Sequence, residues 1–187
     1  MSAVLAPPEE RLMTGEELSR MADVERSEIV NGRLVQMSPT GNEHGAIELR
    51  IGARLLAYAE THQFGKVRSG EVGIYIRRNP DTIRAADVLY ISNERYASRR
   101  SSSYLDVAPD LVVEVLSPGD SWSEVMQKLR DYFSIGVRLI WVVDPAALTV
   151  YAYRSSTEIR EFTAQDDLPG DEVLPGFSVK VVELFEI

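Results

Sequence analysis

The chain has 187 residues, of which 44% are hydrophobic, and its formal net charge is -9. This length and apolar content suffice for one packed domain. The absence of cysteine excludes disulfides, thiolate metal ligands and a cysteine nucleophile, and no segment approaches the ~20 apolar residues of a membrane span. The negative charge opposes non-specific attraction to nucleic acid. We expect a soluble, cytoplasmic protein in which any nucleic-acid site is local.

The N-terminal segment predicts little structure before a short helix. Residues 1–13 are rich in Pro and Glu and are expected to be disordered. Thr14 and Glu17 have the spacing of a capping box, which predicts a helix through about Met21. One domain is expected to span residues 14–187.

A hairpin and a long helix are predicted next. The pair Asn31-Gly32 suits a tight turn in which both central residues have positive φ. Apolar residues at helical spacing then predict a helix over about residues 43–62. Alternating apolar residues predict strands at 66–68, 72–76 and about 86–91, and the polar stretch 94–103 is either a short helix or an exposed loop.

The C-terminal half begins with a strand, helix and strand over residues 111–116, 121–135 and 138–143. This order predicts a right-handed crossover that places two parallel strands in one sheet. Since the preceding hairpin is antiparallel, we expect an α/β fold with a central mixed sheet flanked by helices. Short strands follow near 148–153, 158–162 and 177–182.

Glu114 interrupts the apolar strand 111–116. A strand of this composition is expected to be buried on both faces, where an unpartnered carboxylate costs several kcal/mol. Glu114 must therefore pair with a cation, bind a metal ion or hold a proton.

Asp87 stands at the beginning of the predicted strand 86–91, and two neighbouring strands would bring it close to Glu114. A divalent metal ion with oxygen ligands relieves the repulsion between two close carboxylates. The alternative is that Asp87 caps a turn and that Glu114 pairs with Arg84 or Arg138.

Lys128 lies on the helix that follows the Glu114 strand, in one stripe with Val125 and Tyr132. In a phosphodiester hydrolase, such an amine would orient the attacking water or stabilise the transition state. Alternatively, the lysine stem covers apolar surface and its amine reaches solvent.

Several motifs in order carry a family resemblance, namely 28–34, 37–39, His44, Asp87-Val88, 109–118, Lys128 with Tyr132, 136–137 and 141–145. Over about residues 14–153 the chain resembles the Uma2-like (DUF820) restriction endonuclease family, within the PD-(D/E)XK nuclease superfamily. The resemblance implies a restriction-endonuclease-like core with a divalent-metal site. By resemblance, Asp87 and Glu114 are the metal-binding acids and Lys128 is the catalytic lysine.

Two departures from the superfamily pattern concern the neighbours of these acids. The lysine expected two residues after Glu114 is replaced by Leu116, and Uma2-like sequences generally move it to the next helix. Leu116 points to the same face as Glu114, so a helix crossing that face can deliver the amine of Lys128. Ala86 stands where a proline often precedes the first acid. Asp110 follows a proline but suits a turn rather than the site.

Other polar residues are secondary candidates. His44 could act as a proton shuttle or support a ligand, and Glu71 or Glu28 could add a metal ligand from a strand end. Gln127 could contact the substrate. The pairs Arg77-Arg78 and Arg99-Arg100 are candidate phosphate contacts, although charged pairs in loops are usually only solvated.

The sequence thus predicts a metal-dependent endonuclease. Mg²⁺ or Mn²⁺ would be held by Asp87, Glu114 and the backbone carbonyl of Val115, and Lys128 would assist the attack. DNA is the substrate that the resemblance implies, and cleavage of two strands favours a homodimer. Two alternatives are a catalytically silent nuclease-fold binding or scaffolding module and a buried Glu114–Lys128 ion pair that only fixes the packing.

Overall fold

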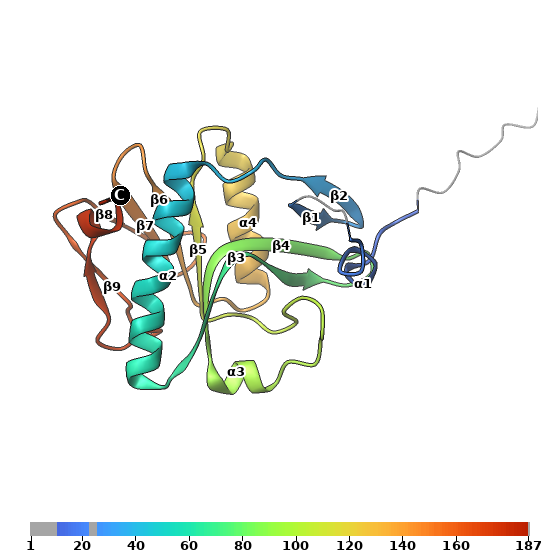
Figure 1. Cartoon of the computed structure of the whole chain (residues 1–187), viewed down its shortest axis with the longest axis horizontal. Coiled ribbons are helices and arrows are strands. Elements are labelled where there is room, and N and C mark those ends of the chain that lie inside the picture. The colour runs from blue at the N-terminus through green and yellow to red at the C-terminus, as the bar shows by residue number, and fades with distance from the viewer. Residues whose placement is uncertain (1–10, 23–25, 187) are drawn as a thin grey trace, which may run out of the picture.

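A mixed β-sheet forms the centre of the protein, as a computed structural model of the chain shows (Figure 1). The structure describes residues 11–22 and 26–186. The main sheet has the strand order β2-β1-β4-β5-β6-β7-β8, and β3 also pairs with β4. Its strands are β1 (Ser27–Val30), β2 (Arg33–Gln36), β3 (Gly65–Arg77), β4 (Thr82–Ser92), β5 (Leu111–Val115), β6 (Leu139–Asp144), β7 (Thr149–Tyr153) and β8 (Ile159–Phe162). Strands β9 (Asp167–Pro169) and β10 (Ser178–Lys180) form a separate pair.

The β5-α4-β6 unit is the predicted crossover. Strands β5 and β6 pair in parallel, with Val113 opposite Trp141, whereas β5 pairs antiparallel with β4 on its other side. The sheet is therefore mixed, as expected from the sequence. The helices are α1 (Gly15–Leu18), α2 (Asn42–His62), α3 (Asn93–Ala97), α4 (Trp122–Ser134) and α5 (Val181–Leu184).

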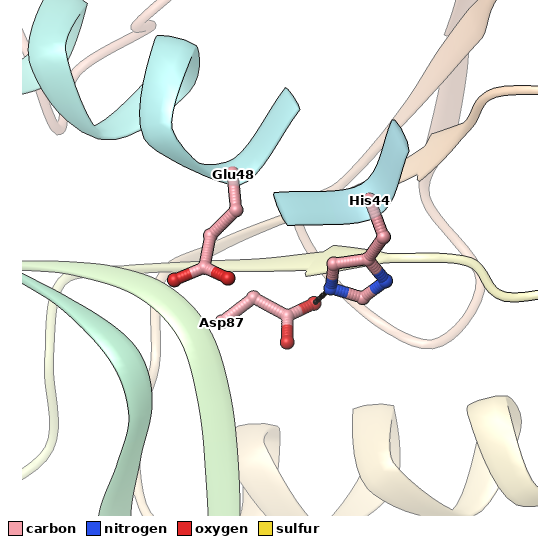
Figure 2. Close-up of side chains that lie close together, drawn as sticks. All are labelled: His44, Glu48 and Asp87. Carbon is pink, nitrogen blue, oxygen red and sulfur yellow. Dashed lines mark ion pairs between the residues drawn. The ribbon is translucent and has the colours of Figure 1, made fainter. Parts of the chain in front are cut away.

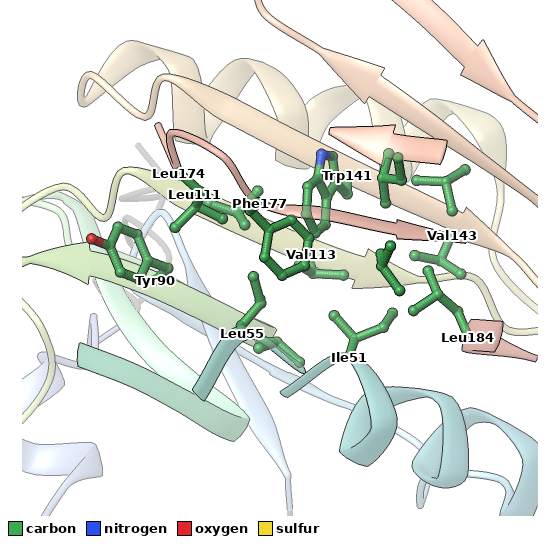
Figure 3. Packing of buried hydrophobic residues seen from close by; sticks show 14 of the residues in the cluster. Ile51, Leu55, Tyr90, Leu111, Val113, Trp141, Val143, Leu174, Phe177 and Leu184 are labelled. Atoms are coloured by element: carbon green, nitrogen blue, oxygen red, sulfur yellow. The ribbon is translucent and has the colours of Figure 1, made fainter. Parts of the chain in front are cut away.

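The two long helices cover opposite faces of the sheet (Figure 1). Helix α2 packs Ile51 and Leu55 against strand residues that include Val113 and Trp141 (Figure 3). Helix α4 packs Leu129 on the other face. Since apolar burial contributes roughly 25 cal/mol per Å², these two layers hold the central strands β4 and β5 firmly. No helix in the described part of the chain is long and apolar enough to cross a membrane.

Local sequence signals are confirmed at the turn and the caps. Asn31 and Gly32 have φ values of 53° and 78°, as the tight turn requires. Thr14 forms the predicted capping box at the start of α1. Ser121 forms a second one at the start of α4, which was not predicted. Gly136 follows α4 with φ of 95°, the left-handed conformation that suits a helix end.

Several predicted boundaries were wrong. Strand β3 is continuous over both predicted segments, 66–68 and 72–76. Strand β4 begins at Thr82, so Asp87 lies in the middle of the strand and does not begin it. Strand β9 was not predicted, and residues 181–182 belong to α5, because such short elements take their conformation from tertiary contacts.

A β-bulge interrupts the pairing of β3 with β4. Ser69 lies opposite Val88 and Val72 opposite Ala86, so Gly70 and Glu71 together face Asp87. Both bulge residues have positive φ, 87° and 53°. A bulge bends its strand and redirects the neighbouring groups, and here the N–H of Gly70 donates to Glu48 of α2.

The N-terminal expectations are tested only in part. Residues 1–10 of the segment expected to be disordered lie outside the described residues. Met13 N–H donates to Gly32 O at 2.8 Å, which ties the end of that segment to the hairpin. A single domain over 14–187 stays a prediction.

Candidate active site

Asp87 occupies a buried position at the centre of the sheet. Only 4% of the residue is exposed. Its Oδ2 accepts a hydrogen bond of 2.7 Å from the backbone N–H of Val115, at the end of β5. This bond ties β4 to the strand that carries Glu114. Because Val88 pairs with Val113 in these two strands, Asp87 and Glu114 occupy neighbouring positions.

Helix α2 brings a histidine and a second acid to Asp87. His44 and Glu48 are one helical turn apart, and both are buried. The two side chains point from α2 toward Asp87, as Figure 2 shows. His44 Nε2 lies 3.3 Å from Asp87 Oδ2, and one ligand atom from each of the three residues lies within 4.8 Å of the others.

The outer contacts of this triad fix its orientation. His44 Nδ1 lies 3.1 Å from Ser117 Oγ in the loop after β5. Glu48 Oε1 accepts a hydrogen bond of 2.7 Å from the N–H of the bulge residue Gly70. The bulge and the loop therefore hold the two α2 side chains in place.

Both α2 side chains titrate abnormally. Burial lowers the pKa of His44, but its contact with Asp87 and the negative charges of Asp87 and Glu48 outweigh this and raise it. Burial raises the pKa of Glu48, and the charges of Asp87 and Glu71 add to that rise. The carboxylates of Glu48, Asp87 and Glu71 thus repel one another, and a cation bound between them would relieve this repulsion.

Helix α4 delivers a lysine and a tyrosine to Glu114. Lys128 Nζ donates to Glu114 Oε2 at 2.8 Å, and Tyr132 Oη donates to Glu114 Oε1 at 2.7 Å. Both carboxylate oxygens of the buried glutamate have a partner. The alternative partners considered from the sequence are engaged elsewhere: Arg84 pairs with Glu28 and Asp131, and Arg138 lies 3.6 Å from Asp110.

The ionisation of this pair follows from its burial. Burial raises the pKa of Glu114, and the charge of Lys128 opposes that rise. Burial alone would lower the pKa of Lys128, but Glu114 and Glu28 raise it above its ordinary value. The amine is therefore a permanent cation beside Glu114.

Glu28 belongs to the same group. Its Oε1 lies 3.5 Å from Lys128 Nζ and accepts a hydrogen bond from Ala85 N–H. Its Oε2 accepts a hydrogen bond of 2.7 Å from Arg84. Lys128 is thus shared between two buried carboxylates.

Glu71 and Arg26 form the outer edge of the site. Arg26 lies 2.5 Å from Glu71 and 3.9 Å from Asp87, and Glu71 also accepts a hydrogen bond from Thr40. Arg26 and Glu48 were not among the sequence candidates. A glutamate within the apolar stripe of α2 was a signal for Glu48, whereas Arg26 lies in a short polar stretch that carries no pattern.

Two other residues lie apart from this group. Gln127 is exposed on α4 and donates to Asp131, so the structure does not bring it to the carboxylates. Asp110 accepts a hydrogen bond from Ser92 N–H and lies 3.3 Å from Arg95. These contacts fit the structural role expected for Asp110.

Asp87 connects two groups of side chains. Its charge raises the pKa of His44 and Glu48 on the α2 side and the pKa of Glu114 on the α4 side. The site therefore consists of a His44–Glu48–Asp87 cluster joined through Asp87 to a Glu114–Lys128–Tyr132 cluster. Concentrated, buried charges of this kind are typical of a functional site.

The donor set of the first cluster fits a divalent metal ion. His44 Nε2 is buried and forms no hydrogen bond within the described residues, although it faces Asp87. Imidazole and carboxylate donors together suit Mn²⁺ and other transition metals, whereas Mg²⁺ prefers oxygen ligands alone. Glu114 is outside this three-residue cluster, and its two carboxylate oxygens accept hydrogen bonds from Lys128 and Tyr132.

Comparisons with known proteins identify the fold and the family of the chain. The chain is similar over 92% of its length to 97% of a crystallised protein from Anabaena variabilis, described as a putative nuclease belonging to DUF820, with 20% identity and a TM-score of 0.76. The fold is therefore that of a DUF820 nuclease structure. The family model of Uma2, described as putative restriction endonuclease, matches residues 16–182. The chain belongs to the Uma2 family, and no curated protein matches it.

Proposed function

We propose that the protein is a metal-dependent endonuclease that hydrolyses phosphodiester bonds in DNA. The carrying observation is the joining of a His44–Glu48–Asp87 cluster to the Glu114–Lys128 pair through Asp87. Uma2 membership supports the nuclease class, and DNA as substrate follows the family description. The chemistry assigned to each residue is our inference from the contacts.

The metal ion would be held at Asp87. His44 and Glu48 offer donors on one side, and Glu114 with the Val115 carbonyl is the oxygen set predicted from the sequence on the other. A bound Mg²⁺ or Mn²⁺ would supply Lewis acidity toward the phosphate and lower the pKa of a coordinated water. The hydrogen bond from Val115 N–H to Asp87 would orient the Asp87 carboxylate for a metal ion held by either group of ligands.

Lys128 would act on the reacting phosphate as the catalytic cation. Its amine contacts Glu114 and lies 3.5 Å from Glu28, so two carboxylates keep it protonated and oriented. A protonated amine at this position can stabilise the negative charge that develops on the phosphoryl oxygens. Tyr132 stays neutral, because burial raises its pKa well above the ordinary value, and its hydroxyl orients Glu114.

Titration calorimetry with Mn²⁺ and Mg²⁺ tests the proposal, together with cleavage of supercoiled plasmid DNA. Wild-type protein should bind at least one of the two ions and nick the plasmid only in its presence. Asp87→Asn should lose both properties, and Glu114→Gln should lose cleavage. Glu161→Gln, on the exposed edge strand β8, is the matched control and should behave as wild type. A folded wild-type protein that binds neither ion contradicts the proposal.

A catalytically silent binding module of the same fold is the second candidate. It is favoured by one observation, the pairing of both Glu114 carboxylate oxygens with donors from the same helix, Lys128 and Tyr132. This module would show no metal binding and no cleavage under any divalent ion. The plasmid assay therefore separates the two functions. We also propose a homodimer, in which two sites would cut the two DNA strands, and sedimentation of the wild-type protein measures its oligomeric state.

A further inference from the structure

A broad open hollow lies beside the candidate active site. Its volume is about 1060 Å³, just above the ~300–1,000 Å³ typical of small-molecule pockets. Four segments distant in the sequence form most of its walls, namely the end of α1, the start of β1, the β3 bulge and the loop after α3, and Arg78 and Ala85 complete the lining. In Figure 1 this loop folds back alongside β3, where Leu105 N–H donates to Gly73 O.

The hollow shares residues with the catalytic group. Gly70 lines the hollow and donates to Glu48. Arg26 also lines it and lies 3.9 Å from Asp87, and its buried Nε has no hydrogen-bond partner within the described residues. A chain lying in the hollow would therefore pass directly beside the acids that would hold the metal ion.

The charges of the hollow differ from those of the whole chain. Four arginines line it, namely Arg20, Arg26, Arg78 and Arg100, against three carboxylates, Glu16, Glu71 and Asp106. Each carboxylate has its own partner. Glu16 pairs with Arg78 at 2.8 Å, Glu71 pairs with Arg26, and Asp106 accepts backbone N–H groups of Arg100 and Ser101. In a protein of net charge -9, this concentration of cations is local.

Two of the four arginines keep their guanidinium groups available. Arg20 and Arg100 are exposed, and neither side chain forms an ion pair within the described residues. By contrast, the sequence neighbours of the lining arginines are occupied: Arg77 donates to Asn31, and Arg99 lies over the ring of Tyr96. Serines 101–103 add hydroxyl groups to the same wall. Arginine and serine are the side chains that commonly contact phosphate oxygens.

We propose that this hollow binds the phosphate backbone of DNA that flanks the scissile bond, with Arg20 and Arg100 as the outer phosphate contacts. The inference rests on the nuclease function proposed above and adds the route of the substrate strand. Arg26 lies where the hollow meets Asp87, so its guanidinium contacts the phosphate nearest the reacting one. A single phosphate-rich strand matches a set of separated cations better than a compact anion does, because each arginine can neutralise a different phosphate.

The first test is DNA binding by the double variant Arg20→Ala/Arg100→Ala. Fluorescence anisotropy with a labelled DNA duplex and with its single strand, in Ca²⁺ and over a series of salt concentrations, measures affinity and the number of phosphate contacts. The affinity should fall by about 10-fold or more, and the slope of log K against log salt should become shallower by about 1.8 for the duplex or about 1.4 for the single strand.

The matched control removes the same charge elsewhere. Arg50→Ala/Arg160→Ala also deletes two arginines, on α2 and on the edge strand β8, and neither residue lines the hollow. Its DNA affinity and salt slope should stay close to those of wild type. Equal losses in the two double variants, or wild-type protein that does not bind DNA, overturn the hollow as a phosphate site.

A small substrate separates this proposal from the proposed function. Hydrolysis of bis(p-nitrophenyl) phosphate in Mn²⁺ needs the metal-binding group but has no flanking phosphates. Arg20→Ala/Arg100→Ala should hydrolyse it at the wild-type rate while losing DNA affinity, whereas Asp87→Asn should lose hydrolysis. If DNA affinity depends on Arg20 and Arg100 but the wild-type protein hydrolyses no substrate, the hollow is supported as a DNA-binding site and the nuclease function is contradicted. A loss of hydrolysis in the arginine variant assigns the two residues to the reaction centre and overturns the backbone role.

Discussion

Lys128 Nζ lies 2.8 Å from Glu114 Oε2, although the two residues belong to different elements, α4 and β5. The position two residues after Glu114, where a lysine was expected, holds Leu116, and the amine that contacts Glu114 comes from α4 instead. The crossover that places α4 over the sheet therefore supplies the cation. The glutamate in the apolar strand is buried as an ion pair, with the tyrosine hydroxyl of Tyr132 as an additional donor.

Removal of the lysine should destabilise the fold strongly. Lys128→Met leaves Glu114 and Glu28 without their shared cation, and an uncompensated buried charge costs about 3–5 kcal/mol. Urea unfolding monitored by circular dichroism gives the change in the free energy of unfolding. The double variant Lys128→Met/Glu114→Gln should recover part of the loss.

An exposed ion pair provides the comparison. Lys180 lies 2.8 Å from Asp167, and both side chains are about half exposed. Lys180→Met should cost less than about 1 kcal/mol, because solvent screens such a pair. Similar costs for Lys128→Met and Lys180→Met would contradict the buried role of the Glu114 pair.

The raised pKa of His44 predicts a pH-dependent stability. A group whose pKa is higher in the folded state stabilises the fold fully below its unfolded pKa, here about 6.5, and this stabilisation is lost as the pH rises through the folded pKa. Asp87 and Glu48 raise the value, and Arg26 opposes them. The stability difference between wild type and His44→Gln should therefore be larger near pH 5.5 than near pH 8.5. Unfolding curves of the metal-free proteins at the two pH values measure it, and equal differences would contradict the contact with Asp87.

Glu48 should contribute to metal affinity. Glu48→Gln keeps the size of the side chain and its hydrogen bond from Gly70, but removes one charge from the cluster. We expect Mn²⁺ to bind at least about 10-fold more weakly. Glu60→Gln, exposed on the same helix, serves as the control. Unchanged Mn²⁺ affinity in Glu48→Gln, measured by calorimetry, would remove this residue from the metal site.

Gly65 begins β3 at a close approach to β4. A Cβ at this position would lie 2.4 Å from the backbone oxygen of Ile91 and 2.7 Å from the ring of Tyr90. Since backbone cannot move aside easily, Gly65→Ala should cost about 1–3 kcal/mol. Gly119→Ala meets no atom within 4 Å and is the control. Thermal unfolding of both variants tests the difference, and an unchanged melting temperature for Gly65→Ala would contradict it.

Much of the fold was predictable because its signals are local and strong. The Asn31-Gly32 turn, the capping box at Thr14 and the apolar stripe of α2 fix their elements by short-range geometry. The bulge at Gly70 and Glu71 was not predicted, because its extra residue is recognised only from the pairing of β3 with β4. The pattern of apolar and polar residues in β3 alone does not mark it.

The candidate site was predicted where one residue breaks an apolar pattern. Glu114 in β5 and Lys128 on the next helix meet as the sequence indicated. Glu48 breaks the stripe of α2 in the same way but was passed over, and Arg26 carries no pattern of its own. The position of Arg26 is set by tertiary contacts with Glu71 and Asp87, which cannot be predicted from the spacing of apolar residues.

The parallel pairing of β5 with β6 also limits when the site can form during translation. Glu114 leaves the ribosome before Lys128, and a nascent chain without α4 has no amine to neutralise this acid. Strand β5 also lacks one neighbour until β6, ending at Asp144, has emerged and the crossover has closed. The residues gathered around Asp87 and Glu114 are thus complete only after most of the polypeptide has been synthesised, and a prematurely terminated product ending before α4 would carry both acids without Lys128.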